Sequence, residues 1–75
     1  MMKEYELVVL TRDMPGHGLR AGDVGTVVHS YHAGACEVEF VSAGGETLAV
    51  LTVTDSDVRA MDHREILHVR NLASR

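Results

Sequence analysis

The chain has 75 residues, one cysteine, and seven Lys and Arg against eleven Asp and Glu, which gives a net charge of −4. A chain of this length forms one domain, and its single cysteine, Cys36, excludes an intrachain disulfide and fits a reducing, cytoplasmic location. The acidic balance and scattered arginines disfavour a nucleic-acid partner, because Lys and Arg supply much of the affinity for phosphates, and the apolar run at residues 7–10 is too short to cross a membrane.

In chain order, four apolar runs predict β-strands, and a shorter fifth run follows them. The residues between the runs are rich in Gly, Asp and Ser, which form turns readily. Strands at this spacing are typical of a small all-β barrel or sandwich. The predicted strands cover residues 7–10, 24–28, 36–41, 48–53 and 58–61.

The stretch "HGLRAGDVGTVV", residues 17–28, joins the first predicted strand to the second through a glycine-rich turn. Its glycines lack the spacing of a phosphate-binding loop, and no strand–helix–strand unit surrounds them. We therefore interpret them as turn residues that set up the barrel, since glycine adopts positive φ without strain.

Residues 36–41, "CEVEFV", alternate between apolar and acidic side chains. Such a period of two predicts that Cys36, Val38 and Phe40 face the core, and that Glu37 and Glu39 face solvent.

Two hairpins flank this strand. The sequence "SAGGE" predicts a tight turn at Gly44 and Gly45 into the next strand. The sequence "HAGA" closes the preceding hairpin, but its loop length is open, and a register shift of one residue would move His29 to the other face of the sheet.

The predicted strands at residues 7–10 and 48–53 are apolar on both faces. A strand covered on one side only alternates instead, so we expect something to cover their outer sides. The candidates are the C-terminal segment and a second copy of the chain, and a small domain without disulfides often needs such association. We therefore expect a homodimer.

The C-terminal segment, residues 62–75, fits two structures. Asp62 followed by Glu65 is a helix-capping pattern, and the apolar residues beyond it would form one stripe of a short helix. An extra strand would instead place Leu67 and Val69 on one face. We expect the helix, with the strand as alternative, as an extension that packs on the barrel of residues 1–61 or on a second subunit.

The segments "VVLTRDMPGHGLRAGDVGTVV", "EVEFV" and "GETLAVLTV" carry a family resemblance. The pattern L-x-x-G-D-x-G-T-V resembles SH3-like barrels, including KOW-type modules, and residues 4–61 resemble a family of short bacterial SH3-like proteins without an assigned function. The resemblance implies a five-stranded SH3-like barrel and is silent on activity. The acidic charge departs from nucleic-acid-binding KOW modules, so RNA binding does not carry over.

One set of side chains has the composition of a zinc site. His29, His32 and Cys36 lie close together around one hairpin, and zinc prefers nitrogen and sulfur ligands. A structural zinc site usually has four ligands, and the fourth is missing nearby. We expect no bound metal and no cofactor, and keep metal binding as an alternative function.

Catalysis is not expected. Cys36 is in phase with core residues, so we expect it to face the core rather than to act as an accessible nucleophile, and a chain this small has little room for a ligand cavity of about 300 Å³. We expect a non-catalytic protein-interaction module, with an antitoxin-like or accessory subunit for a basic protein as a further alternative. The candidate partner-binding residues lie on loops and on the C-terminal segment: His17, Tyr31, His32, Ile66, Val69 and Leu72.

Overall fold

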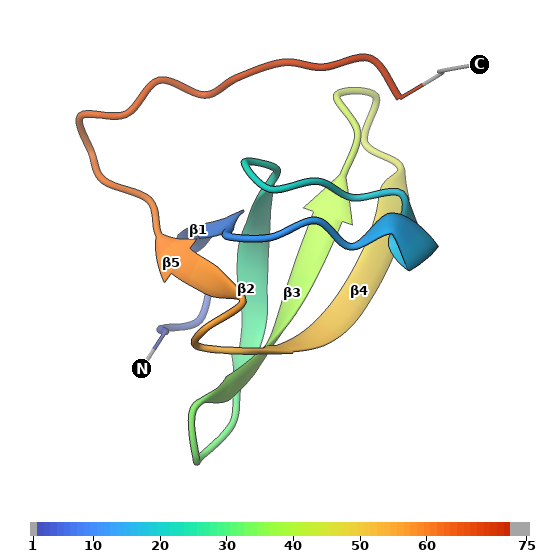
Figure 1. Cartoon of the computed structure of the whole chain (residues 1–75). Coiled ribbons are helices and arrows are strands. Elements are labelled where there is room, and N and C mark those ends of the chain that lie inside the picture. Colours follow the sequence, from blue (N-terminus) through green and yellow to red (C-terminus); the bar gives the residue numbers. More distant parts are fainter. Residues whose placement is uncertain (1, 73–75) are drawn as a thin grey trace.

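A computed structural model describes residues 2–72, and it is all-β (Figure 1). A single 3₁₀ turn, η1 (Pro15–His17), interrupts the loop between the first two strands. The strands are β1 (Leu7–Leu10), β2 (Val24–Ser30), β3 (Ala35–Val41), β4 (Thr47–Thr54) and β5 (Val58–Ala60). All five strands predicted from the sequence are confirmed, with ends that differ by two residues or fewer.

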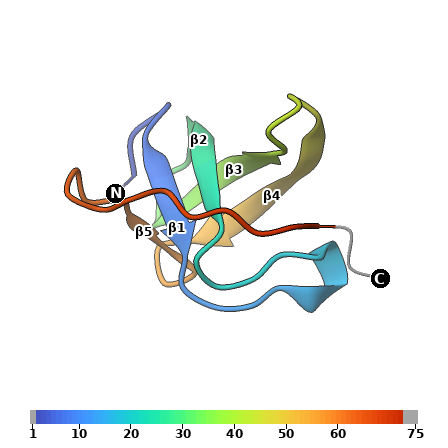
Figure 2. The same cartoon turned by 90° about the horizontal axis from the view of Figure 1, so that it is seen from above.

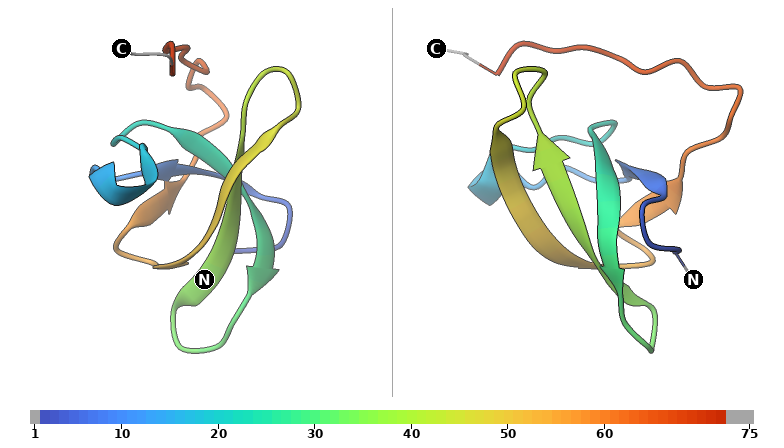
Figure 3. Two further views of the ribbon diagram at one scale, coloured as in Figure 1. Left: turned by 90° about the vertical axis from the view of Figure 1, so that its right-hand side faces the viewer. Right: turned by 180° about the vertical axis from the view of Figure 1, so that it is seen from behind.

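The strands form one antiparallel sheet in the order β4-β3-β2-β1-β5. The sheet curls so strongly that its two ends face each other, which gives the predicted small SH3-like barrel (Figure 2). The β2–β3 and β3–β4 hairpins extend to opposite ends of this barrel (Figure 3). Strands β4 and β5 are not paired with each other, so each remains a sheet edge.

The core confirms the alternation predicted for β3. Cys36, Val38 and Phe40 are buried, and they pack with side chains from every other strand and with Leu19 of the β1–β2 loop. Strand β2 crosses this cluster at Gly25, where an added Cβ would lie 2.5 Å from Val38 and 2.8 Å from Phe40. Only glycine therefore lets β2 approach β3 this closely.

The glycine-rich loop before β2 forms turns that lead the chain from β1 into β2, as expected from "HGLRAGDVGTVV". It folds back on itself through a bridge between Met14 and Leu19, with Gly18 at φ 70° ending η1. The carboxylate of Asp23 accepts a hydrogen bond from the Arg20 backbone N–H at 2.8 Å and closes the last turn before β2.

The register of the β2–β3 hairpin settles the position of His29. A bulge follows Val27, and His29 lies opposite Glu37, so its side chain is on the outer, solvent-facing side of the sheet.

The C-terminal segment corrects the sequence analysis. Residues 62–72 form neither helix nor strand, and residues 73–75 lie outside the described part of the chain. The capping pattern does form locally, because the Asp62 N–H donates to Glu65 Oε1 at 2.7 Å. The helix does not continue: Arg70 is held at Asp23 across the barrel, and a helix this short is marginal without a packed face.

The two strands predicted to be apolar on both faces differ in burial, and Leu7 at the start of β1 is 44% exposed. In β1, Val8, Val9 and Leu10 are all buried, whereas Leu48 and Val50 of β4 stay substantially exposed. The C-terminal segment crosses the end of the barrel above β1 and β2 (Figure 2) and leaves β4 uncovered. Within residues 2–72, no helix is long and apolar enough to cross a membrane.

Candidate protein-binding surface

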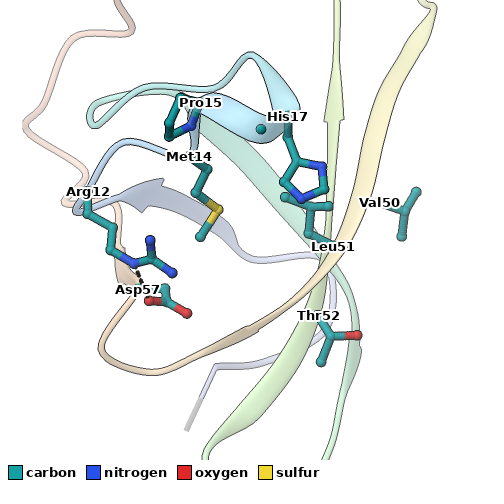
Figure 4. A pocket seen from close by; sticks show the side chains of 9 residues that line it. Arg12, Met14, Pro15, His17, Val50, Leu51, Thr52 and Asp57 are labelled. Carbon is teal, nitrogen blue, oxygen red and sulfur yellow. Dashed lines mark hydrogen bonds and ion pairs between the residues drawn. The ribbon is translucent and has the colours of Figure 1, made fainter.

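A groove runs between the β1–β2 loop and the middle of β4 (Figure 4). The volume of this open groove is about 520 Å³, so the chain leaves more room than the about 300 Å³ for which the sequence predicted little space. The loop that contains η1 lies beside β4 in this groove and, within residues 2–72, does not pair with it. Its lining residues are Arg12, Met14, Pro15, Gly16, His17, Val50, Leu51, Thr52 and Asp57.

Strand β4 forms one wall of the groove and is also a free sheet edge. Its eight residues, TLAVLTVT, include no charged residue, no proline and no glycine. Natural proteins usually guard exposed edges with charges, prolines or very short strands, because an open row of backbone N–H and C=O groups pairs readily with another chain. The other edge, β5, has three residues and carries Arg59.

Apolar side chains extend from β4 onto the outer face of the sheet. Val50 is 49% exposed, and Leu48 on the same strand is 40% exposed. The edge thus combines unpaired backbone groups with apolar contact area.

The opposite end of the groove is polar and hydrogen-bonded. Arg12 Nε donates to Asp57 Oδ1 at 2.8 Å, and Asp57 Oδ2 accepts from the Thr54 N–H at 3.0 Å and from the Thr54 hydroxyl at 3.1 Å. The Thr54 backbone hydrogen bond, then Arg12, lower the pKa of Asp57, so this carboxylate is charged at neutral pH. Met14 and His17 extend from the loop toward β4 (Figure 4).

The hairpin candidates form a separate surface on the outer face of β2. The ring of Tyr31 meets His29 edge-on with centroids 4.5 Å apart, and His29 Nδ1 lies 3.5 Å from Glu4 Oε2. Burial and neighbouring Glu37 raise the pKa of Tyr31. His32 lies exposed at the hairpin tip.

The metal alternative gains no geometric support. Cys36 is 1% exposed and faces the core, whereas His29 faces outward. Among residues 2–72, no three His, Cys, Asp or Glu side chains are grouped so that they could hold a metal ion. Burial, and to a lesser degree Asp55, raise the pKa of the Cys36 thiol, which makes it a poor nucleophile and ligand.

The C-terminal candidates do not pack on their own barrel as expected. Ile66 is 90% exposed and Val69 is 89% exposed, while Leu72 is about half exposed. The segment is tied to the barrel on either side of Ile66 and Val69. Arg59 donates to both carboxylate oxygens of Glu65 at 2.9 and 2.7 Å, and Arg70 donates to both oxygens of Asp23 at 2.8 and 2.7 Å.

The structure thus separates the predicted partner-binding residues into three places. His17 lines the groove, Tyr31 and His32 lie on the hairpin, and Ile66, Val69 and Leu72 lie on the C-terminal segment. Sequence analysis missed the β4 wall, although the absence of charge from residues 47–54 was a signal for an edge meant to be paired.

An acidic strip accompanies these surfaces. Glu37 and Glu39 lie side by side on the outer face of β3, opposite His29 and Thr26 of β2. Within the described residues neither carboxylate forms an ion pair, and Glu39 only accepts a hydrogen bond from Thr47 at 2.7 Å.

Comparison with known proteins gives one match. The model of a family described as "Domain of unknown function (DUF4926)" matches residues 4–60, which covers the barrel through β5 and leaves out the C-terminal segment. No curated protein and no solved structure matches the chain.

Proposed function

The chain belongs to the DUF4926 family, a domain of unknown function, and we propose that it is a non-catalytic protein-interaction module that binds an extended segment of a partner protein along β4. The observation that carries this proposal is the free, uncharged β4 edge beside an open groove. A cytoplasmic location accords with the proposal, because Cys36 is the sole cysteine.

The geometry supports binding by strand addition. An extended segment gains backbone hydrogen bonds from a sheet edge and specificity from alternate side chains that enter pockets. Here those side chains would meet Met14 and Leu51 inside the groove and Val50 on the outer face. The loop at residues 12–17 leaves a groove beside β4, so a single strand fits better than the edge of another sheet.

A basic partner is the second candidate, and the acidic strip favours it. Among residues 2–72, Glu37 and Glu39 form no ion pair, and the chain has a net charge of −4. Positive residues flanking the bound segment would be attracted to this face. An accessory subunit that neutralises a basic protein would use the same surface.

Peptide selection against the full chain tests the proposal. We expect a random peptide library to yield extended apolar sequences that shift the backbone amide resonances of residues 47–54. The Val50→Lys variant should lose this binding, since lysine guards sheet edges. The Val41→Lys variant is the matched control, because Val41 is equally exposed but lies on a strand paired on both sides. Selected peptides that shift only the β2–β3 hairpin would refute the proposal.

A further inference from the structure

We propose that the barrel holds out residues 65–70 of its C-terminal segment, that this segment adds as a strand to the β4 edge of a second copy of this chain, and that two such contacts close a homodimer. This inference rests on the proposed function, because it names the occupant of the same edge.

The segment is held in place by two clamps, each made of an arginine and a carboxylate. The Arg59 guanidinium binds Glu65 through two hydrogen bonds, and the Arg70 guanidinium binds Asp23 through two more and the Gly18 carbonyl at 2.9 Å. Paired hydrogen bonds of this kind fix both position and orientation. Residues 65–70 are therefore tied to the barrel at both ends, although they form no helix or strand of their own.

The clamped segment presents its apolar side chains to solvent. Ile66 and Val69 lie between the clamps. Among the large apolar side chains of residues 2–72, they have the highest exposed fractions, 90% and 89%. Clamps that served only the stability of the barrel would be expected to turn such residues inward, where their burial is favourable. A segment held at both ends and facing outward has instead fewer conformations to lose when it binds, which favours binding to a partner.

The receiving surface is the β4 edge with its groove. This edge spans eight residues, longer than the clamped segment, and carries no charge that would oppose Ile66 or Val69. Val50 and Leu51 supply apolar contacts at its centre.

A second copy is the occupant that matches both surfaces. Within residues 2–72, each chain carries one clamped segment without secondary structure and one open β4 edge, so two copies can match both through two equal contacts. Two-fold closure is the commonest arrangement of soluble homo-oligomers. A chain of 75 residues without a disulfide also belongs to the size class in which association commonly supplements a small core.

Sedimentation of the full-length chain over a wide concentration range tests the dimer. We expect Val50→Lys and Val69→Lys each to raise the dissociation constant at least about tenfold, since a lysine at either surface would be brought against apolar groups. Val41→Lys is the control for the edge and should change it less than about twofold, because Val41 lies outside the contact. A wild-type chain that stays monomeric throughout overturns the inference.

Mixing the two interface variants tests the pairing itself. A heterodimer of Val50→Lys with Val69→Lys keeps one intact contact, from the segment of the first chain to the edge of the second. Native mass spectrometry with one chain isotopically labelled should therefore show more heterodimer than either homodimer. If Val69→Lys alone leaves the dimer intact, the β4 edges pair with each other and the inference is wrong.

The effect of the clamps on dimerisation can be measured separately. Arg70→Gln removes a clamp but no apolar side chain, so we expect weaker dimerisation, while Arg64→Gln, an exposed arginine outside both clamps, leaves it unchanged. A merely structural role of Arg70 would lower the melting temperature without changing the dissociation constant. If the chain is monomeric yet selected peptides still bind β4, the inference fails and the proposed function stands; if no peptide binds β4 either, both fail.

Discussion

Arg70 and Asp23 are 47 positions apart in the sequence and form the bidentate ion pair that ties the C-terminal segment to the barrel, with the side chains 25% and 17% exposed. Asp23 is also the residue that closes the turn into β2 through the Arg20 N–H. One carboxylate therefore both shapes the glycine-rich loop and holds the segment. Hydrogen bonds from Arg70, and then from the Arg20 backbone, lower its pKa.

The double role of Asp23 predicts a pH-dependent loss of stability. Asp23→Asn should lower the free energy of unfolding by about 1–2 kcal/mol at neutral pH, because charged hydrogen bonds are lost. The folded-state pKa lies below the unfolded one, so this stabilisation is complete above the unfolded pKa and disappears as the pH falls through the folded pKa. Urea denaturation at several pH values checks this. Asp55→Asn, whose exposed side chain forms no hydrogen bond within residues 2–72, should have little effect.

The strands were predictable because their signals are local. The alternation in "CEVEFV" and the glycine pair before β4 depend only on neighbouring residues, and both appear in the structure as expected. The glycine-rich loop was also interpreted correctly, since the positive φ of Gly18 and Gly22 follows from turn chemistry.

The C-terminal segment and the groove were not predictable, because long-range contacts decide them. The Asp62–Glu65 pattern signals a helix, and its capping hydrogen bond forms, but the pairing of Arg70 with Asp23 keeps the chain from winding. The groove depends on where η1 lies relative to β4, and nothing in the local sequence of either element specifies that distance.

Gly25 predicts a sharp steric effect. Gly25→Ala places a Cβ 2.5 Å from Val38 Cγ1 and 3.0 Å from the Glu39 carbonyl oxygen, so the two strands must separate. We expect a loss of about 2–3 kcal/mol in the free energy of unfolding, the range for overpacked cores. Gly16→Ala is the matched control, because nothing lies within 4 Å of its added Cβ, and it should change stability by less than about 0.5 kcal/mol. Equal losses in the two variants would contradict the close approach of β2 and β3.

The Asp57 turn predicts a coupling between the groove and the β4–β5 connection. Asp57→Asn weakens the hydrogen bonds from Thr54 and Arg12, so we expect a loss of about 1–2 kcal/mol and faster amide exchange at Thr54. The control is again Asp55→Asn, two residues away in the same turn. Unchanged exchange at Thr54 would mean that Asp57 does not hold this end of the groove.

The burial of the Cys36 thiol predicts that it reacts slowly with thiol reagents in the folded protein. Its side chain is 1% exposed, and burial raises its pKa, so the reactive thiolate is scarce and shielded in the folded protein. A thiol-specific disulfide reagent should react with the native chain at a small fraction of the rate measured in urea. Rapid reaction of the native protein would instead show that the Cys36 thiol is accessible enough to act as a ligand or nucleophile.

The last prediction concerns Glu65, which anchors the near end of the C-terminal segment. Two hydrogen bonds from Arg59, then the Asp62 backbone N–H, lower its pKa from 4.5 to about 2. Because the folded pKa is depressed, the clamp is complete above the unfolded pKa and opens as the pH falls toward 2. A carbon-detected NMR titration should give a midpoint for Glu65 well below 4.5, and Arg59→Gln should move it back upward. Since Ile66 follows directly, the same acid titration should loosen the segment and, where the dimer forms as proposed, dissociate it over the same pH range. A Glu65 midpoint that is insensitive to Arg59→Gln would show that the arginine does not hold the segment in solution.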